Sequence, residues 1–286
     1  MPLLLLLFLV LAVPAQANDF GSDFGYILPE INTVNSPESS RTFRFRLGAL
    51  DVCTEKGLAL VRPQTFTVFH LHDGEMERTE HLSVLEETET YGARSWQAEI
   101  FFPESGVYQL VMQSKPVWQP EQDSFSQYMV KLLFPALDSS SGWDCVPDTS
   151  FTIVPCSRPF GLLAGMLLSG QVLRDGKPLS NALVEVARLD PELPMSITAT
   201  APARSKRKLP ERILPTRLQA VQQVKADSRG IFAFACPQPG WWVFSSSVDG
   251  DPLKDYEGKL KPVRCRTELW AYFAPIPTVK PAGGKK

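Results

Sequence analysis

Short apolar segments separated by turns that contain proline or glycine recur along most of this chain, and this pattern restricts the folds available to it. Residues 42–50 (TFRFRLGAL) alternate apolar and polar side chains, as a strand with one buried face does. Residues 64–72 (QTFTVFHLH) are rich in Thr, Val and Phe, and the Asp73-Gly74 pair that follows predicts a tight hairpin turn. Long helical patterns are scarce, whereas the chain has 25 prolines and 18 glycines. We therefore predict an all-β protein.

Further strands continue this pattern as far as residue 155. Residues 95–102 and 106–114 are predicted to form a second hairpin across Pro103-Glu104-Ser105, and residues 129–135 and 150–155 two more strands. Regularly spaced short strands of this kind are typical of a β-sandwich. We predict that residues 18–160 form an N-terminal, immunoglobulin-like sandwich.

The pattern changes at about residue 160. Strands are predicted at residues 170–173, 182–186, 231–235 and 241–245, with turns at residues 175–178 and 227–230. This order of strands and turns resembles the transthyretin/carboxypeptidase-regulatory type of small sandwich. We therefore predict two tandem β-sandwich domains, the second over residues 161–273. A long loop at residues 189–223 and a disordered tail at residues 274–286 complete the division.

The N-terminus has the character of an export signal. An apolar run at residues 3–13 is followed by the small-x-small sequence Ala15-Gln16-Ala17. This pattern predicts a secretory signal peptide at residues 1–17, cleaved after Ala17, and a periplasmic location. No later apolar run approaches the ~20 residues of a membrane-spanning helix, so we expect no membrane span in the mature chain.

Charge and motifs argue against several classes of function. The chain carries 29 Lys and Arg against 31 Asp and Glu, so no excess of positive charge favours nucleic acid. It has no Gly-x-Ser-x-Gly nucleophile elbow, no phosphate-binding loop and no dinucleotide fingerprint. We predict that the protein is not an enzyme.

Five cysteines in an oxidising compartment predict disulfides. Proximity and the domain boundary favour the pairs Cys145–Cys156 and Cys236–Cys265, which leaves Cys53 free. Five unpaired thiols are the alternative. No CxxC or CxxH spacing is present, so a cysteine-based metal site is disfavoured.

The hairpin at residues 64–80 carries the best candidate metal ligands. His70 and His72 are two residues apart in a strand and therefore point to the same face. A two-residue turn places Glu75 opposite His72 and Glu77 opposite His70, with cross-strand Cβ atoms ~5 Å apart. These nitrogen and oxygen donors suit Ni²⁺, Co²⁺, Zn²⁺ or Cu²⁺. His81 falls too far along the strand to join them. The alternative is a solvated surface without metal.

Three segments together resemble a known family. They are residues 116–160 (PVWQPEQDSF…GWD…IVPCSRPFG), 170–186 (GQVLRDGKPLSNALVEV) and 225–242 (KADSRGIFAFACPQPGWW). They resemble the periplasmic accessory proteins of bacterial nickel/cobalt uptake systems of the ABC or ECF type, a family of largely unknown function, over residues 19–273. The resemblance implies a transthyretin-like C-terminal module, Ni²⁺ or Co²⁺ as the ion (with Zn²⁺ possible in vitro) and a membrane permease as partner.

The chain departs from that family at its characteristic histidines. Asn18 and Ser22 stand where the resemblance implies histidine, and Leu50-Asp51 stands where it implies His-Pro. Two other functions remain open. The protein is alternatively a structural or interaction module of the cell envelope, with the basic cluster at residues 204–208 as a docking arm. A weaker possibility is carbohydrate binding by an exposed tryptophan, although Trp143 and Trp241 are expected to pack in the core.

Overall fold

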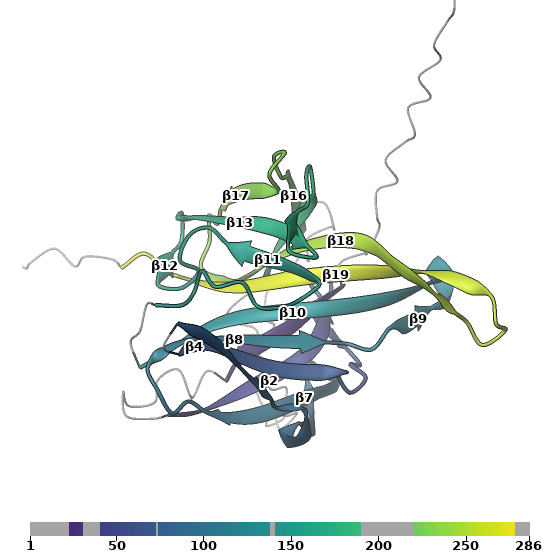
Figure 1. Ribbon diagram of the computed structural model, residues 1–286, viewed down its shortest axis with the longest axis horizontal. Helices are drawn as coiled ribbons and strands as arrows, with labels where there is room; N and C mark the ends of the chain where they lie inside the picture. Colours follow the sequence, from purple (N-terminus) through teal and green to yellow (C-terminus); the bar gives the residue numbers. More distant parts are fainter. Residues whose placement is uncertain (1–22, 31–40, 73, 138–140, 190–219, 278–286) are drawn as a thin grey trace, which may run out of the picture.

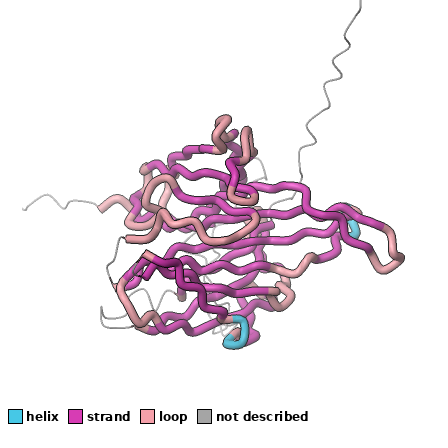
Figure 2. Tube along the Cα trace, viewed as in Figure 1, coloured by secondary structure: helices cyan, strands magenta, loops and turns pink. Residues whose placement is uncertain are grey.

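The computed structural model describes residues 23–30, 41–72, 74–137, 141–189 and 220–277. The predicted signal peptide, the basic cluster at residues 204–208 and residues 278–286 of the predicted tail lie outside these ranges. Strands dominate the described residues, as Figure 2 shows, and the prediction of an all-β fold is confirmed. Helical structure in these ranges consists of two 3₁₀ turns, η1 (Leu82–Val84) and η2 (Pro120–Gln122). Neither has the length and apolar character of a membrane-spanning helix.

The strands form three sheets, which we call lower, central and upper from their positions in Figure 1. The lower sheet has five strands: β1 (Asp23–Pro29), β2 (Thr42–Asp51), β3 (Lys56–Leu58), β6 (Glu86–Thr90) and β7 (Ala93–Phe101). The central sheet has ten: β4 (Thr65–His72), β5 (Glu75–Glu80), β8 (Gly106–Gln113), β9 (Val117–Gln119), β10 (Ser124–Ala136), β12 (Leu162–Leu163), β15 (Leu183–Leu189), β16 (Val221–Lys225), β18 (Gly240–Lys254) and β19 (Leu260–Ala274). The upper sheet has four: β11 (Phe151–Pro155), β13 (Leu167–Arg174), β14 (Lys177–Pro178) and β17 (Ile231–Ala235).

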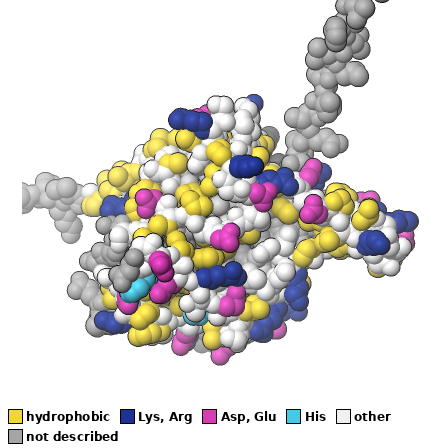
Figure 3. All heavy atoms as spheres, viewed as in Figure 1, with side chains coloured by type: hydrophobic (Ala, Val, Ile, Leu, Met, Phe, Trp, Pro, Cys, Tyr) yellow, Lys and Arg dark blue, Asp and Glu magenta, His cyan; other side chains and the backbone are white. Residues whose placement is uncertain are grey.

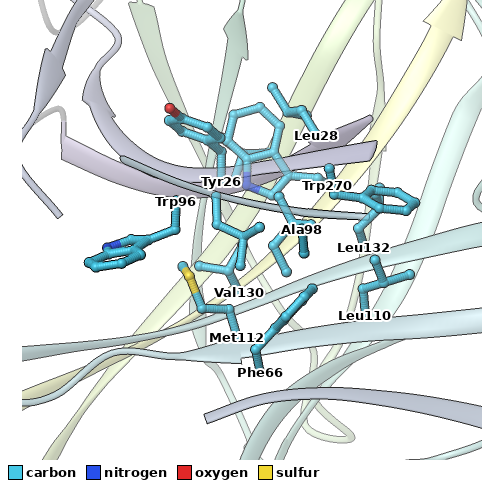
Figure 4. Close-up of a cluster of buried hydrophobic side chains, with 14 of the residues drawn as sticks. Tyr26, Leu28, Phe66, Trp96, Ala98, Leu110, Met112, Val130, Leu132 and Trp270 are labelled. Atoms are coloured by element: carbon cyan, nitrogen blue, oxygen red, sulfur yellow. The ribbon is translucent and has the colours of Figure 1, made fainter. Parts of the chain in front are cut away.

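The middle of the central sheet is covered on both faces, and successive side chains along its strands enter different cores. On β18, Val243 packs in the lower core, between the lower and central sheets, whereas Phe244 packs in the upper core, between the central and upper sheets. On β19, Trp270 points into the lower core and Leu269 into the upper one. Figure 4 shows the lower core, where side chains of β1 and β7 meet those of β4, β8, β10 and β19. A two-sided core of this kind explains why the central strands are apolar at successive positions.

The central sheet extends across the predicted domain boundary. β10, before the boundary, pairs in parallel with β19, with Phe125 opposite Val263 and Leu132 opposite Trp270. β11, also before it, pairs with β13 of the upper sheet. The sandwich-like arrangement is confirmed, but a division into two tandem domains is not. The structure also places residues 221–223 of the predicted loop in β16, and Ala274 of the predicted tail in β19.

The predicted second hairpin does not form. β7 pairs with β2 and β6 in the lower sheet, whereas β8 pairs with β4 and β10 in the central sheet. Burial along the two strands gives the reason. β7 alternates between buried and more accessible residues, while β8 is buried at seven consecutive positions and therefore needs a layer on each side. The turn at residues 102–105 consequently crosses from one layer to the other.

Neither predicted disulfide is present, and all five cysteines are free thiols. The Cys236 carbonyl accepts a hydrogen bond from Gly165 N–H (2.7 Å), and the adjacent Ala164 N–H donates to the Ala274 carbonyl (2.8 Å). Cys236 therefore lies at the Ala274 end of β19, and Ala274 is nine residues from Cys265 along that strand. At ~3.3 Å per strand residue the separation is about 30 Å, far beyond the ~7 Å that a disulfide can bridge between Cα atoms.

The other predicted disulfide fails because its two cysteines are attached to different layers. The Cys145 carbonyl accepts a hydrogen bond from Gln109 Nε2 of β8 (2.8 Å), in the central sheet. The Cys156 N–H donates to the Ser169 carbonyl of β13 (2.8 Å), in the upper sheet. Because packed sheets lie about 10 Å apart, Cys145 and Cys156 are separated in space although they are close in sequence.

A buried ionic cluster lies on the lower face of the central sheet. Arg266 Nη2 lies 2.8 Å from Glu185 Oε2 and 2.8 Å from Ser245 Oγ. Its Nε lies 3.2 Å from Glu268 Oε1, and its guanidinium carbon lies 4.1 Å from the centroid of the Phe24 ring. Burial raises the pKa of Glu268 to about 8, although the nearby Arg266 charge opposes that shift. The lower core therefore contains charges that interact with one another, and its stability depends on pH, whereas apolar packing has neither property.

Candidate metal centre

The hairpin of β4 and β5 forms with the register that the sequence predicts. His72 lies opposite Glu75 and His70 opposite Glu77, and Gly74 in the turn has a φ of +85°. A positive φ is easily adopted by glycine, which lacks a Cβ atom, and this permits the tight connection. The rings of His70 and His72 have centroids 6.3 Å apart, so both imidazoles project on one side of β4.

The third potential ligand comes from the turn between β7 and β8. Glu104 Oε2 lies 2.6 Å from His72 Nδ1. One ligand atom from each of His70, His72 and Glu104 falls within 4.8 Å of the others, and this is the group of possible metal ligands that the described residues contain. Figure 3 shows a histidine side chain at the surface beside acidic side chains, on the face of the molecule that is in view.

The three side chains differ in exposure, and this difference gives the site a closed and an open side. His70 is 7% exposed, whereas the His72 and Glu104 side chains are 39% and 49% exposed. The Nε2 atom of His70 is buried and has no hydrogen-bond partner among the described residues. It lies directly over Gly106, where a Cβ atom would be 2.2 Å away. A buried ring nitrogen without a hydrogen-bond partner destabilises the folded state. Because this one lies beside two other potential metal ligands, a metal ion is a candidate for its partner.

Tyr108 contacts both parts of the site. Its ring stacks on His70, with centroids 4.1 Å apart and planes 8° from parallel. Its hydroxyl donates a hydrogen bond to the Glu104 carbonyl (3.1 Å) and accepts one from the Glu104 N–H (3.4 Å). Burial raises the pKa of Tyr108 above its ordinary value, so the hydroxyl remains a donor at neutral pH.

The structure brings together only part of the predicted ligand set. Glu75 and Glu77 are exposed and lie opposite the two histidines in the register, but they do not belong to the group whose ligand atoms converge. His81 lies away from the site, as predicted. Its N–H donates to the Phe66 carbonyl (2.7 Å), and burial lowers its pKa.

Two imidazole nitrogens and one carboxylate oxygen form a donor set that suits Zn²⁺, Ni²⁺ and Co²⁺. Bonds of about 2.0–2.2 Å to a tetrahedral ion place donor atoms about 3.3 Å apart. The existing separations, at most 4.8 Å, therefore require small rotations of the side chains. His72 and Glu104, which are exposed, have room for such rotations. The donor chemistry and the geometry of these residues therefore fit a divalent transition-metal ion.

Three of the tryptophans on and near the central sheet, Trp143, Trp241 and Trp242, pack in or against the cores. Trp241 packs against the lower core and Trp242 lies in the upper core, so the two adjacent residues point in opposite directions, as successive residues of a strand do. Trp143 packs against the upper core. The Trp118 ring lies 5.1 Å from that of Phe125, between ring centroids. The core contacts of Trp143 and Trp241 agree with the expected packing role.

Glu104 is the candidate ligand that the sequence did not reveal. It lies in a short turn, and its place beside the histidines depends on the pairing of β8 with β4, which puts Tyr108 opposite His70. A signal for that pairing was present, because residues 106–112 are almost continuously apolar and so predict a strand buried on both faces.

Comparison with known proteins identifies the family of the chain. The family described as Domain of unknown function (DUF4198) matches residues 22–250, most of the chain, and the chain therefore belongs to it. A search of curated proteins finds no match. Among solved structures, a marsupial T cell receptor matches with 11% sequence identity and a TM-score of 0.21, over 84% of this chain and 70% of that chain. A likeness at that score supports no conclusion about fold or function.

Proposed function

We propose that this protein binds a divalent transition-metal ion through His70, His72 and Glu104, and that it serves as a non-enzymatic, periplasmic accessory component of nickel or cobalt uptake. The observation that carries the proposal is the convergence of three ligand atoms within 4.8 Å, one of them on a buried histidine. The resemblance of residues 116–160, 170–186 and 225–242 to such accessory proteins supports the link to uptake. A membrane permease is the partner that this role requires.

The exposure of the site fits delivery better than permanent storage. His72 and Glu104 are accessible to solvent, so a donor group of a partner can approach the ion from their side. The buried His70 would hold the ion from the opposite side.

Calorimetric titration of the mature, tag-free protein with Ni²⁺, Co²⁺ and Zn²⁺ tests the proposal. We expect one ion per chain in the wild type and no detectable binding after the double substitution His70→Ala/His72→Ala. Glu104→Gln keeps the shape of the side chain but removes its charge, and should weaken binding strongly.

The matched control is Glu75→Gln/Glu77→Gln, which removes two carboxylates from the same hairpin. The control should bind as the wild type does, because neither residue belongs to the converging group. A loss of binding in the control with normal binding in Glu104→Gln would restore the ligand set predicted from sequence. If no metal produces heat or a thermal shift with the wild type, metal binding is refuted and a structural or interaction role is favoured.

A further inference from the structure

One side chain links the two parts of the metal centre, which come from separate segments of the chain. His70 belongs to β4, whereas Glu104 belongs to the turn that leads from the lower to the central sheet. Tyr108 on β8 lies directly opposite His70 in the β4–β8 register. Its ring contacts the imidazole, and its hydroxyl reaches both backbone polar groups of Glu104.

These contacts restrict different motions. The parallel stack, 4.1 Å between centroids, limits rotation of the His70 ring on the face toward Tyr108. Gly106 lies against the Nε2 edge of the same ring, so the imidazole is held on two sides by residues of β8. The two hydrogen bonds to Glu104 hold the backbone of the turn in place, whereas its side chain is 49% exposed and contacts His72. Outer residues of this kind orient metal ligands in many proteins.

We infer that Tyr108 is a positioning residue of the metal centre, which holds the His70 ring and the Glu104 turn in the arrangement that binds an ion. The inference rests on the proposed function, because it concerns the same site. Tyr108 itself forms no bond to the metal. The hydroxyl acts on Glu104, and the ring acts on His70.

Two substitutions separate these contributions. Tyr108→Phe keeps the ring and removes the hydroxyl, so it should weaken Co²⁺ or Zn²⁺ binding by about tenfold, the lower end of the 10–100-fold range for outer-shell residues. Tyr108→Leu removes the stack as well and should weaken binding further. Tyr91→Phe is the matched control, because it removes the hydroxyl of another buried tyrosine that lies outside the site. The control should bind metal as the wild type does.

A double-substitution cycle distinguishes positioning from general support of the fold. If the Tyr108 hydroxyl acts through the Glu104 carboxylate, Tyr108→Phe should have no further effect on metal affinity in a Glu104→Gln background. The visible absorption spectrum of bound Co²⁺ should also change in Tyr108→Phe, since the geometry of its oxygen ligand changes.

The outcomes are distinct for the two proposals. If the wild type binds no metal, both the proposed function and this inference fail. If the wild type binds metal but Tyr108→Phe has the same affinity and Co²⁺ spectrum, the positioning role alone is overturned. An equal loss of affinity in the wild-type and Glu104→Gln backgrounds also overturns it, because such additivity indicates a general effect on folding.

Discussion

Replacing Gly106 with alanine tests whether the buried histidine belongs to the metal centre. Gly106 is the first residue of β8 and does not have a positive φ, so its backbone tolerates alanine. The added Cβ atom would lie 2.2 Å from His70 Nε2 and 2.9 Å from Cδ2, whereas ordinary contact begins at 3.4 Å. The ring edge must therefore move by about 1.2 Å, the difference between those two distances. The cheapest motion is rotation of the imidazole away from the strand.

This rotation has unequal effects on stability and on metal affinity. Overpacking costs about 1–3 kcal/mol in general, and the lower end applies here because the tip of a side chain can move aside. A cost of 1 kcal/mol lowers the melting temperature by about 2 °C in a chain of 286 residues. Metal affinity should fall by about 10–100-fold or more, because a ligand loses its orientation.

Thermal unfolding without metal and calorimetric titration with Zn²⁺ measure the two effects. Gly250→Ala is the matched control, since its Cβ would lie 2.7 Å from Cys265 Sγ and so overpacks the same sheet away from the metal centre. We expect similar destabilisation in both variants and weaker metal binding in Gly106→Ala alone. Wild-type affinity in Gly106→Ala would refute the assignment of His70 as a ligand.

Three other predictions concern two buried ionisable groups and the cysteines. The pKa of Glu268 is raised from 4.5 to about 8, so the folded state holds this proton more tightly than the unfolded state, and stability should fall as pH rises between those values. Glu268→Gln should flatten that part of the curve in denaturant unfolding. Burial lowers the pKa of Lys131 from 10.5 to about 7, which has the opposite sign, so stability should rise with pH across that interval and Lys131→Met should remove the rise. Alkylation of unfolded, unreduced protein followed by mass measurement should label all five cysteines, and a protected pair would restore a disulfide.

The sequence was sufficient to predict structure where the determinants are local. The Asp73-Gly74 turn and the alternation of residues 64–72 predicted the register that places Glu75 opposite His72. A two-residue turn permits few registers, and a slip by one residue would turn both histidines to the other face. The same alternation explains why Trp241 and Trp242 enter different cores.

Pairings between distant segments could not be predicted from these patterns. β10 and β19 are separated by more than a hundred residues, yet they are neighbours in the central sheet. Local propensity shows that each is a strand, but the choice of neighbour depends on which faces the rest of the chain covers. β7 and β8 illustrate the resulting error, because adjacency in sequence suggested a hairpin where burial on both faces of β8 required a central position. Glu104 was missed as a candidate ligand for the same reason.

The position of the metal centre bears on what a bound ion does for the protein. His70 and His72 belong to the central sheet, and Glu104 lies where the chain crosses from the lower sheet, so an ion would join two layers. An ion at one hundred times its dissociation constant stabilises the folded state by about 2.7 kcal/mol through mass action. The lower and upper cores are nonetheless extensive and do not depend on the site for their packing. A chain that folds without its ion can take it up and release it while folded, and this is what a carrier requires and a structural zinc site does not provide.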